Sequence, residues 1–190
     1  NKFKAAEVHN LRMAFEEVSG EDLNWFFDQW FLNNGHPVLE VTHKVDKENN
    51  MLVLNVKQLQ DYKEFPIYKL PVDVAIWDET GKTTKRIVID SVEQSFQFPI
   101  KGALKNVLFD EQQMLLGKVF EDKSTDEFAH QFTHANRWKA RNTAFSRVAN
   151  TPSDKADELI GGALKDPFWN IRLTAINLVK ELPKEKALTH

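Results

Sequence analysis

The order of apolar and polar residues divides this chain into a helical start, a middle part with strand periodicity and a helical end. In residues 1–35, apolar side chains recur every three or four positions, as they do along one face of an amphipathic helix. The first helix of this part is expected to end near Ser19 and Gly20. Its apolar positions are Val8, Leu11, Phe15 and Val18.

A second helix is expected around the segment WFFDQWFLNNG, which begins at Trp25. Ser19 followed by Asp22 resembles a capping box, in which two side chains bond the free backbone groups of a first turn. Gly35 suits the left-handed residue after a helix end, and Pro37 prevents the helix from resuming. The apolar stripe is broad and consists of Leu23, Phe26, Phe27, Trp30 and Phe31.

After the second helix the period changes to two, which is typical of β-strands. Polar turns at 46–50 and 78–81 separate the alternating segments. Because several short strands follow one another with no helix between them, we expect residues 36–123 to form an antiparallel β-sandwich. Strand alternation should distribute Val72, Val74 and Ile76 between its inner and outer faces.

The helical period returns in residues 124–190. Four short helices are expected there, at roughly 125–135, 136–149, 152–165 and 167–182. Ser124 and Glu127 form a capping-box pair at the start of the first of these helices. Two further sites place a capping side chain before a proline at the first helical position, namely Thr151-Pro152 and Asp166-Pro167.

This last part also contains a repeat. The sequence WKARNTAFSRV, which begins at Trp138, aligns without a gap with WNIRLTAINLV, which begins at Trp169. Five of the eleven positions are identical, which is more than two amphipathic helices share through polarity alone. A repeated helix pair is typical of an α-solenoid of the HEAT or armadillo kind. About three repeats are needed for stability, so the solenoid is expected to continue past His190.

Composition narrows the classes of function. The 190 residues carry a formal net charge of −3, and both signs occur in every part of the chain, so no basic stripe indicates nucleic-acid binding. No apolar run reaches the ~20 residues of a membrane helix. The absence of cysteine excludes disulfides and thiolate sites and indicates no compartment. Because Asn1 opens the chain inside a helical pattern, we expect a piece of a longer protein, and localisation stays unknown.

His130 and His134 are the one pair with the spacing of metal ligands. Positions i and i+4 share a helical face, as in the H-E-x-x-H motif of zinc peptidases. Gln131 stands where that motif has its glutamate, and an amide cannot act as the general base for a zinc-bound water. We therefore expect two exposed histidines opposite the Phe128 face, with adventitious metal binding as the alternative.

The other histidines and the acidic residues do not form a recognisable active site. The other histidines are expected on helix, loop and strand surfaces, at His9, His36 and His43. The acidic pairs are expected to be solvated at helix ends and turns, and they are Glu16/Glu17, Asp78/Glu79 and Asp110/Glu111. No Ser/His/Asp spacing or phosphate-binding glycine loop occurs. We assign no catalytic, cofactor-binding or metal residue.

The segment FEEVSGEDLNWFFDQWFLNNGHPVLEV, which begins at Phe15, resembles the end of the catalytic domain in aminopeptidase N-like zinc metallopeptidases, the gluzincin aminopeptidases. In that family a VSG-x-DL-x-x-FF-x-QW helix leads through G-x-P-x-L-x-V into a β-sandwich. The resemblance continues at Gln58 and Gln60, at Phe65–Val72 and Asn106–Asp110, and at Trp138, Arg141, Ala144, Asp166-Pro167 and Arg172.

The resemblance implies three domains. Residues 1–35 would be the last helices of a catalytic domain, 36–123 a β-sandwich domain, and 124–190 the start of a helical-repeat domain. The family binds zinc through H-E-x-x-H and a downstream glutamate, and neither this motif nor the family's G-x-M-E-N loop occurs here. Zinc is therefore expected in the parent enzyme and not in this chain, which should be inactive alone.

Two functions remain open from the sequence. The chain could be the C-terminal fragment of a zinc-dependent aminopeptidase that removes N-terminal residues from peptides, with the sandwich and the repeats shaping access to an active site elsewhere. Its partners would then be the missing N-terminal and catalytic domains. Alternatively, it could be a scaffold or protein-interaction module of a non-catalytic relative. In either case the N-terminal helices should expose an apolar patch, or associate with another copy.

Overall fold

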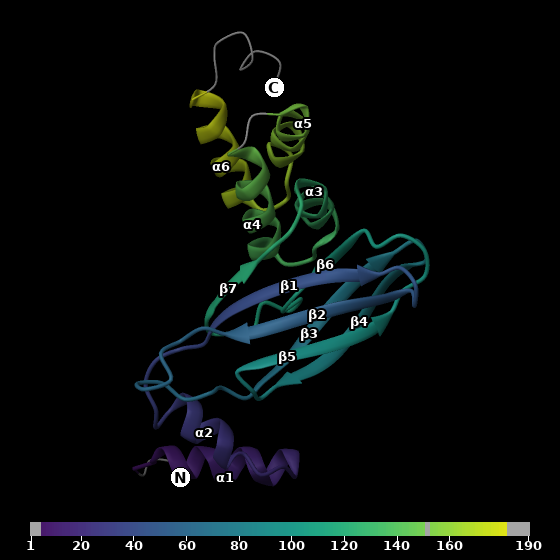
Figure 1. Ribbon diagram of the computed structural model, residues 1–190. Coiled ribbons are helices and arrows are strands. Elements are labelled where there is room, and N and C mark those ends of the chain that lie inside the picture. Colours follow the sequence, from purple (N-terminus) through teal and green to yellow (C-terminus); the bar gives the residue numbers. More distant parts are fainter. Residues whose placement is uncertain (1–4, 151–152, 182–190) are drawn as a thin grey trace.

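The computed structural model describes residues 5–150 and 153–181, which form six helices and seven strands (Figure 1). Two helices lie at one end of the molecule, α1 (Val8–Ser19) and α2 (Asn24–Trp30). Four lie at the other end, α3 (Thr125–His134), α4 (Trp138–Ala149), α5 (Asp154–Ala163) and α6 (Trp169–Glu181). The strands lie between these groups, so the protein is of the mixed α and β class.

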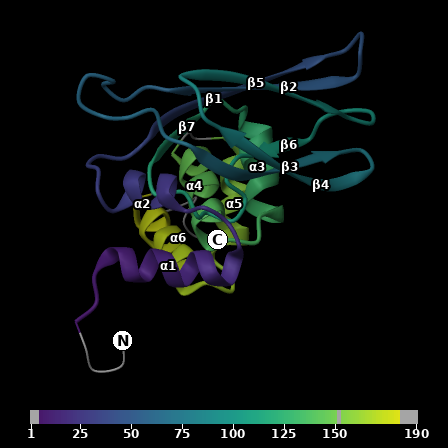
Figure 2. The same ribbon diagram turned by 90° about the horizontal axis from the view of Figure 1, so that it is seen from below.

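The strands form two sheets. A four-stranded sheet has the order β5-β2-β1-β7, with β1 (Val38–Asp46), β2 (Met51–Gln58), β5 (Glu93–Pro99) and β7 (Lys118–Glu121). A three-stranded sheet has the order β4-β3-β6, with β3 (Leu70–Asp78), β4 (Gly81–Ile89) and β6 (Asn106–Leu108). Seen from the α1 end, both groups of helices lie toward the three-stranded sheet (Figure 2).

The four-stranded sheet is not purely antiparallel, which corrects the sequence prediction. β7 pairs with β1 in parallel, with Val38 opposite Lys118 and Val41 opposite Glu121. The other strand pairs are antiparallel. A parallel partner requires a long connection, and the chain passes through both sheets between β1 and β7 before it returns.

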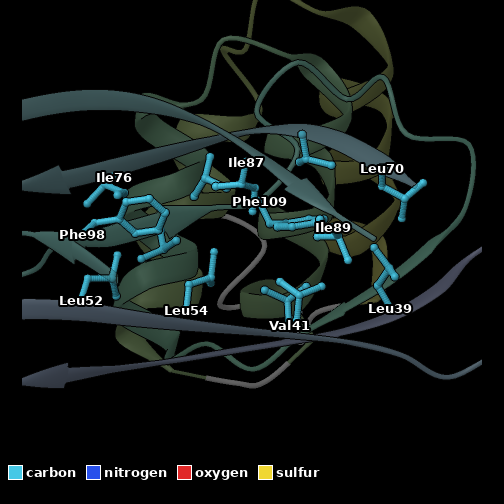
Figure 3. Close-up of a cluster of buried hydrophobic side chains, with 14 of the residues drawn as sticks. Leu39, Val41, Leu52, Leu54, Leu70, Ile76, Ile87, Ile89, Phe98 and Phe109 are labelled. Atoms are coloured by element: carbon cyan, nitrogen blue, oxygen red, sulfur yellow. The ribbon is translucent and has the colours of Figure 1, made fainter. Parts of the chain in front are cut away.

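Side chains from both sheets share one hydrophobic core (Figure 3). Val72, Val74 and Ile76 all belong to it, because residues two apart on a strand point to the same face. The expectation that these three would be distributed between two faces is therefore wrong. Their labelled neighbours in this core include Leu39, Val41, Leu52, Leu54, Leu70, Ile87, Ile89, Phe98 and Phe109.

The opposite face of the three-stranded sheet is covered by α3 and α4. Trp77 and Ala75 of β3 and Leu108 of β6 form a buried cluster with Ala135 and Ala140. The small side chains of the two alanines allow the helices to approach the sheet closely. Both faces of β3 are thus buried, which explains the unbroken run of buried residues from Val74 to Asp78.

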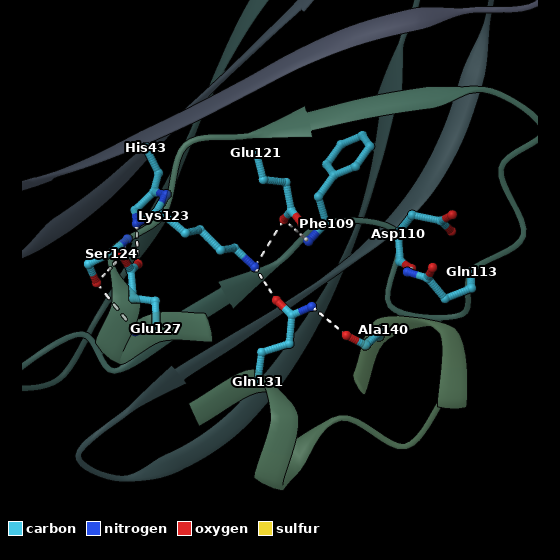
Figure 4. Close-up of polar contacts among 10 residues, drawn as sticks. All are labelled: His43, Phe109, Asp110, Gln113, Glu121, Lys123, Ser124, Glu127, Gln131 and Ala140. Carbon is cyan, nitrogen blue, oxygen red and sulfur yellow. Dashed lines mark hydrogen bonds and ion pairs between the residues drawn. The ribbon is translucent and has the colours of Figure 1, made fainter. Parts of the chain in front are cut away.

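A buried lysine links this helical pair to the sheets (Figure 4). The side chain of Lys123 is 1% exposed; its Nζ lies 3.0 Å from Oε1 of Glu121 and donates to Oε1 of Gln131 at 2.6 Å. Gln131 in turn donates from Nε2 to the carbonyl oxygen of Ala140 at 2.9 Å. An ammonium withdrawn from water without partners is strongly unfavourable, so these contacts hold β7, α3 and α4 together.

His43 of β1 makes a second link, because its Nε2 lies 2.5 Å from Oε1 of Glu127 in α3. Its side chain is only 10% exposed, so the expectation of a strand-surface histidine is wrong. The capping box of Ser124 and Glu127 is confirmed. Burial alone would raise the pKa of Glu127, but the hydrogen bonds from His43 and Ser124 and the charge of His43 together lower it to about 2.

The two sequence repeats adopt the same local geometry. Trp138 and Trp169 are the first residues of α4 and α6, so they occupy equivalent positions in the two repeats, as expected. Arg141 donates from Nη1 to the carbonyl oxygens of residues 135 and 136, at 3.3 and 2.9 Å. Arg172 donates from Nη1 to the carbonyl oxygens of residues 166 and 167, at 2.7 and 3.0 Å. The alignment of the two repeats therefore holds for the backbone as well as for the sequence.

The helix starts differ in part from the predictions. α2 begins at Asn24 without a side-chain cap, so the capping box of Ser19 and Asp22 is wrong. These two side chains instead accept hydrogen bonds from the backbone N–H groups of Glu21 and Asn24, which makes local turns. Gly20, with φ of 71°, ends α1 as expected.

The later helix starts shift by a few residues. The site Thr151-Pro152 lies outside the described residues, and Ser153 caps α5 by accepting from the N–H of Ala156 at 3.1 Å. Asp166 accepts from the N–H of Phe168 at 2.8 Å, but α6 begins only at Trp169, so Pro167 is not its first residue.

Replacing the repeat arginine should test the packing of the helical end. Arg141→Gln removes two hydrogen bonds to Asp166, whose side chain is 6% exposed and would keep an unpaired charge. We expect the free energy of unfolding to fall by about 3 kcal/mol in denaturant titrations. The exposed Arg147→Gln should change it by less than about 0.5 kcal/mol. Equal losses in the two variants would contradict the assignment.

The pair of His43 and Glu127 should make stability depend on acidic pH. Glu127→Gln should lower the free energy of unfolding at pH 7 by about 1.5–3 kcal/mol, because a charge-assisted hydrogen bond is lost. Since the folded pKa of about 2 lies below the ordinary 4.5, the carboxylate stabilises fully above pH 4.5 and loses its contribution as the pH falls toward 2. The difference in free energy of unfolding between wild type and Glu127→Gln should therefore become smaller as the pH falls from 4.5 toward 2.

Denaturant titrations at several pH values between 7 and 2.5 would measure this difference. Glu48→Gln, in the exposed turn after β1, is the matched control and should show no such narrowing. A gap between wild type and Glu127→Gln that stays constant down to pH 2.5 would contradict the assignment.

Candidate functional site

The predicted histidine pair is a packed structural feature. The rings of His130 and His134 stack at 3.9 Å between centroids and 7° between planes, and the ring of His130 also meets Trp77 at 5.7 Å. The expectation of two exposed histidines is therefore wrong for His130, which is half-buried. Burial, followed by the charges of His134 and Lys105, lowers the pKa of His130. The neutral ring is thus favoured against the sheet.

This arrangement does not fit zinc. The lone pairs of an imidazole lie in the plane of its ring, so two rings in parallel planes cannot direct nitrogens at one ion. Nδ1 of His134 already lies 2.9 Å from the carbonyl oxygen of His130 and 2.7 Å from Oγ1 of Thr133. Within residues 5–150 and 153–181, no group of three or more His, Cys, Asp or Glu side chains could hold a metal ion.

Three acids that the sequence places in solvent are buried, so this expectation is wrong for Asp78, Asp110 and Glu111. Asp78 accepts hydrogen bonds from the N–H of Lys101 at 2.9 Å and from the N–H and Oγ1 of Thr80. The bond from Lys101, and then those from Thr80, lower the pKa of Asp78. Its role is to fasten one loop to the turn between β3 and β4.

Asp110 and Glu111 organise the segment after β6. The carboxylate of Asp110 accepts from the N–H groups of Met114 and Leu115, at 3.0 and 2.9 Å. Glu111 pairs with Lys82 and accepts from Oγ1 of Thr84, both on β4. Each of these buried acids is bound by protein donors that fix neighbouring segments, which indicates a structural role.

A groove of about 790 Å³ lies between α2 and the three-stranded sheet. Aromatic side chains of α2 and its end form one wall, namely Trp25, Phe26, Trp30 and Phe31. β3 and the residue before it contribute Lys69, Leu70, Pro71, Val72 and Asp73, and β4 contributes Arg86. The segment after β6 contributes Asp110, Gln112, Met114, Leu115 and Leu116.

Gln29 and Trp30, which follow each other in α2, fix the aromatic wall in place. Gln29 accepts from the N–H of Lys69 at 2.7 Å and donates to its carbonyl oxygen at 3.2 Å, as a strand neighbour would. Trp30 packs on the core shared by the sheets and lies 5.5 Å from the ring of Tyr68. The other face of α2 is left toward the groove and solvent.

A buried glutamine pair holds the loop to which α2 attaches. Gln58 accepts from the N–H of Tyr68 at 2.9 Å and donates to its carbonyl oxygen at 2.8 Å. Gln60 donates to Gln58 at 2.8 Å and to the carbonyl oxygen of Pro66 at 2.9 Å. Since both amides are used in this way, the loop after β2 has a fixed shape.

Gly35 is required by close packing. Its φ is 85°, and a Cβ there would lie 2.3 Å from the ring of Phe65. The residue is left-handed as expected but lies beyond the end of α2, which stops at Trp30, so it does not terminate the helix. Any side chain at position 35 would displace Phe65, and with it the loop whose Pro66 and Tyr68 bind Gln60 and Gln58.

The apolar face of α1 is largely exposed in the described part of the chain. No residue of α1 is buried, and its large apolar side chains are all at least 41% exposed. They are Val8, Leu11, Met13, Phe15 and Val18. Phe26, Phe31 and Leu32 at α2 are also exposed, whereas Phe27 is buried. An apolar surface of this kind is typical of a protein-contact site.

The groove's chemistry favours protein contact over catalysis. Its charges are already engaged, because Asp73 and Arg86 pair at 3.0 Å and Lys69 lies 4.6 Å from the centre of the Trp25 ring. No nucleophile with an adjacent base lines it. In the sequence, this surface is indicated only by the broad apolar stripe of α2. The segment after β6, which also lines the groove, shows no helical or strand periodicity.

None of the helices in the described part of the chain is long and apolar enough to cross a membrane.

A comparison with models of known protein families gives no match. Among curated proteins, the chain is similar to puromycin-sensitive aminopeptidase of Caenorhabditis elegans, with 25% identity over 99 residues. That stretch covers 50% of this chain and 10% of the relative.

Among solved structures, the fold is similar to that of Legionella pneumophila aminopeptidase A, crystallised in complex with aspartic acid. The TM-score is 0.70 at 17% identity, and the match covers 86% of this chain and 20% of that protein. At this identity the likeness concerns the fold alone. The chain thus spans a tenth and a fifth of these two proteins, and the comparisons together support an aminopeptidase-related piece of polypeptide.

Proposed function

We propose that this chain is a non-catalytic C-terminal portion of a polypeptide related to zinc aminopeptidases. In this proposal residues 1–35 are the last helices of a catalytic domain, 36–123 form a β-sandwich and 124–190 begin a helical-repeat domain of the HEAT or armadillo kind. The sandwich and the repeats support the catalytic part and shape access of peptides to its active site.

The uncovered apolar surface of α1 and α2 is the observation that carries the proposal. A helix with no buried residue does not gain the burial energy that normally stabilises a short helix in a protein, so α1 requires a partner. The groove continues this surface onto the three-stranded sheet through Trp25, Phe26 and Phe31. We propose that the preceding part of the same polypeptide covers both.

Zinc binding and bond cleavage belong to that preceding part in this proposal. The H-E-x-x-H motif is absent from the sequence, and the stacked pair of His130 and His134 is geometrically unsuited to a metal. The aminopeptidase names of the two similar proteins support the reaction class. The role of this chain is then architectural.

Sequencing the coding region upstream of the Asn1 codon separates this proposal from its alternative. A continuous reading frame that contains H-E-x-x-H and a downstream glutamate supports the aminopeptidase. A continuous frame without that motif would instead indicate a scaffold or interaction module of a non-catalytic relative.

The isolated chain should not cleave aminoacyl arylamides and should carry no stoichiometric zinc, because no ligand set is found in the described residues. Elemental analysis and a hydrolysis assay with added zinc would measure this. The double variant His130→Ala/His134→Ala is the matched control. About one zinc per chain that is lost in this variant, or hydrolysis lost with it, would contradict the proposal.

The N-terminal helices should be the least protected helices of the isolated chain. Backbone amides in α1 should exchange hydrogen at least about 100-fold faster than those of β2, because few buried contacts oppose local opening. Mass-spectrometric hydrogen exchange on a sample shown to be monomeric would test this. Equal protection of α1 and β2 in that monomer would show that the helices need no further partner.

A further inference from the structure

Asn106, the first residue of β6, carries a side-chain amide that is withdrawn from solvent and unpaired. The residue is 0% exposed, and neither Nδ2 nor Oδ1 has a hydrogen-bond partner in the described part of the chain. An amide that loses water without gaining a partner is unfavourable, so buried polar groups are almost always bonded to protein or to ordered water. The side chain of Asn106 therefore requires a partner.

Strand geometry places this amide on the face of the sheet that α3 and α4 cover. Val107 belongs to the core between the two sheets, so Asn106 and Leu108 point to the opposite face. The only polar side-chain group in the cluster on that face is the indole N–H of Trp77, which does not bond Asn106. The other members of the cluster are apolar, namely Ala75, Leu108, Ala135 and Ala140.

A second unpaired atom lies beside the same tryptophan. Nδ1 of His130 in α3 is buried and has no hydrogen-bond partner within residues 5–150 and 153–181. The ring of His130 lies 5.7 Å from the ring of Trp77, and Trp77 is directly opposite Asn106 in the ladder between β3 and β6. The charge of Lys105 contributes to the lowered pKa of His130, which also indicates that β6 begins close to this ring.

A water molecule matches what these atoms can bond. The amide of Asn106 offers both donors and an acceptor, while Nδ1 of a neutral imidazole donates or accepts according to its tautomer. Water can take either role and makes about three hydrogen bonds when it is buried. A cation suits this place less well, because the cluster contributes no carboxylate and Lys105 adds positive charge nearby.

We propose that a water molecule is bound between β6 and α3, where it bridges the side-chain amide of Asn106 to Nδ1 of His130. It links the three-residue strand β6 to the helix that lies against it, independently of the buried charge of Lys123. The proposal concerns the joint between sheet and helices, so it does not depend on the aminopeptidase likeness.

A crystal structure of the unaltered chain, at a resolution that shows ordered waters, tests the site directly. We expect a water oxygen within about 3.2 Å of one amide atom of Asn106 and of Nδ1 of His130. Well-defined density without this water would overturn the proposal. So would a direct hydrogen bond between the amide and the ring, because no bridge would then be needed.

Unfolding equilibrium constants from denaturant titrations test the site in solution. Asn106→Leu removes the amide and leaves Nδ1 of His130 without its water, so the unfolding constant should rise about tenfold. An amide that is simply unpaired gives the opposite result, since an apolar side chain of similar shape would then be preferred. An unfolding constant of Asn106→Leu that is unchanged or lower would therefore overturn the proposal.

A double-mutant cycle tests whether the two residues share the water. Asn106→Leu combined with His130→Phe should raise the unfolding constant about tenfold less than the product of the two single effects, because each change removes the other group's partner. His134→Phe, in the same histidine stack, is the matched control and should multiply with Asn106→Leu to within about twofold. Simple multiplication for His130→Phe as well would overturn the proposal.

Discussion

The buried charge of Lys123 is the constraint around which the centre of the molecule is arranged. Its side chain can leave water only because Glu121 supplies the opposite charge and Gln131 supplies an acceptor. These partners belong to β7 and α3, so strand and helix cannot shift independently. Gln131 also bonds the carbonyl oxygen of Ala140, which extends the constraint to α4. Gln131 occupies the position that the catalytic glutamate has in an H-E-x-x-H motif, and here this residue is needed for packing.

The parts of the fold that depend on local periodicity could be predicted from the sequence. Alternation predicts β1 to β5 and a short strand at β6, the polar turn at 78–81 separates β3 from β4, and the capping pair of Ser124 and Glu127 is present. The repeat is also seen in the structure, because Arg141 and Arg172 make the same cap on the carbonyl oxygens that precede α4 and α6. In each case the signal lies within a few residues along the chain, where backbone geometry and side-chain spacing are directly linked.

What the sequence did not reveal depends on partners distant along the chain. β7 is four residues long with only two apolar positions, and its parallel pairing with β1 leaves no local trace. His43 and Asp110 are polar residues, yet both are largely buried, because the chain folds hydrogen-bond partners against them. The groove was missed for the same reason: its apolar stripe is visible at α2, but its other walls come from β3, β4 and the segment after β6.

The parallel pairing of β1 and β7 has a mechanical consequence. The chain enters β1 from the α2 side and leaves β7 toward α3, so the two helical groups are attached to opposite ends of one strand pair. A force that pulls these groups apart would slide β1 against β7 along their length. The hydrogen bonds between the strands would then bear the load together, in shear, instead of breaking one after another. The four paired residues would act as a tension-bearing clamp between the two ends of the molecule.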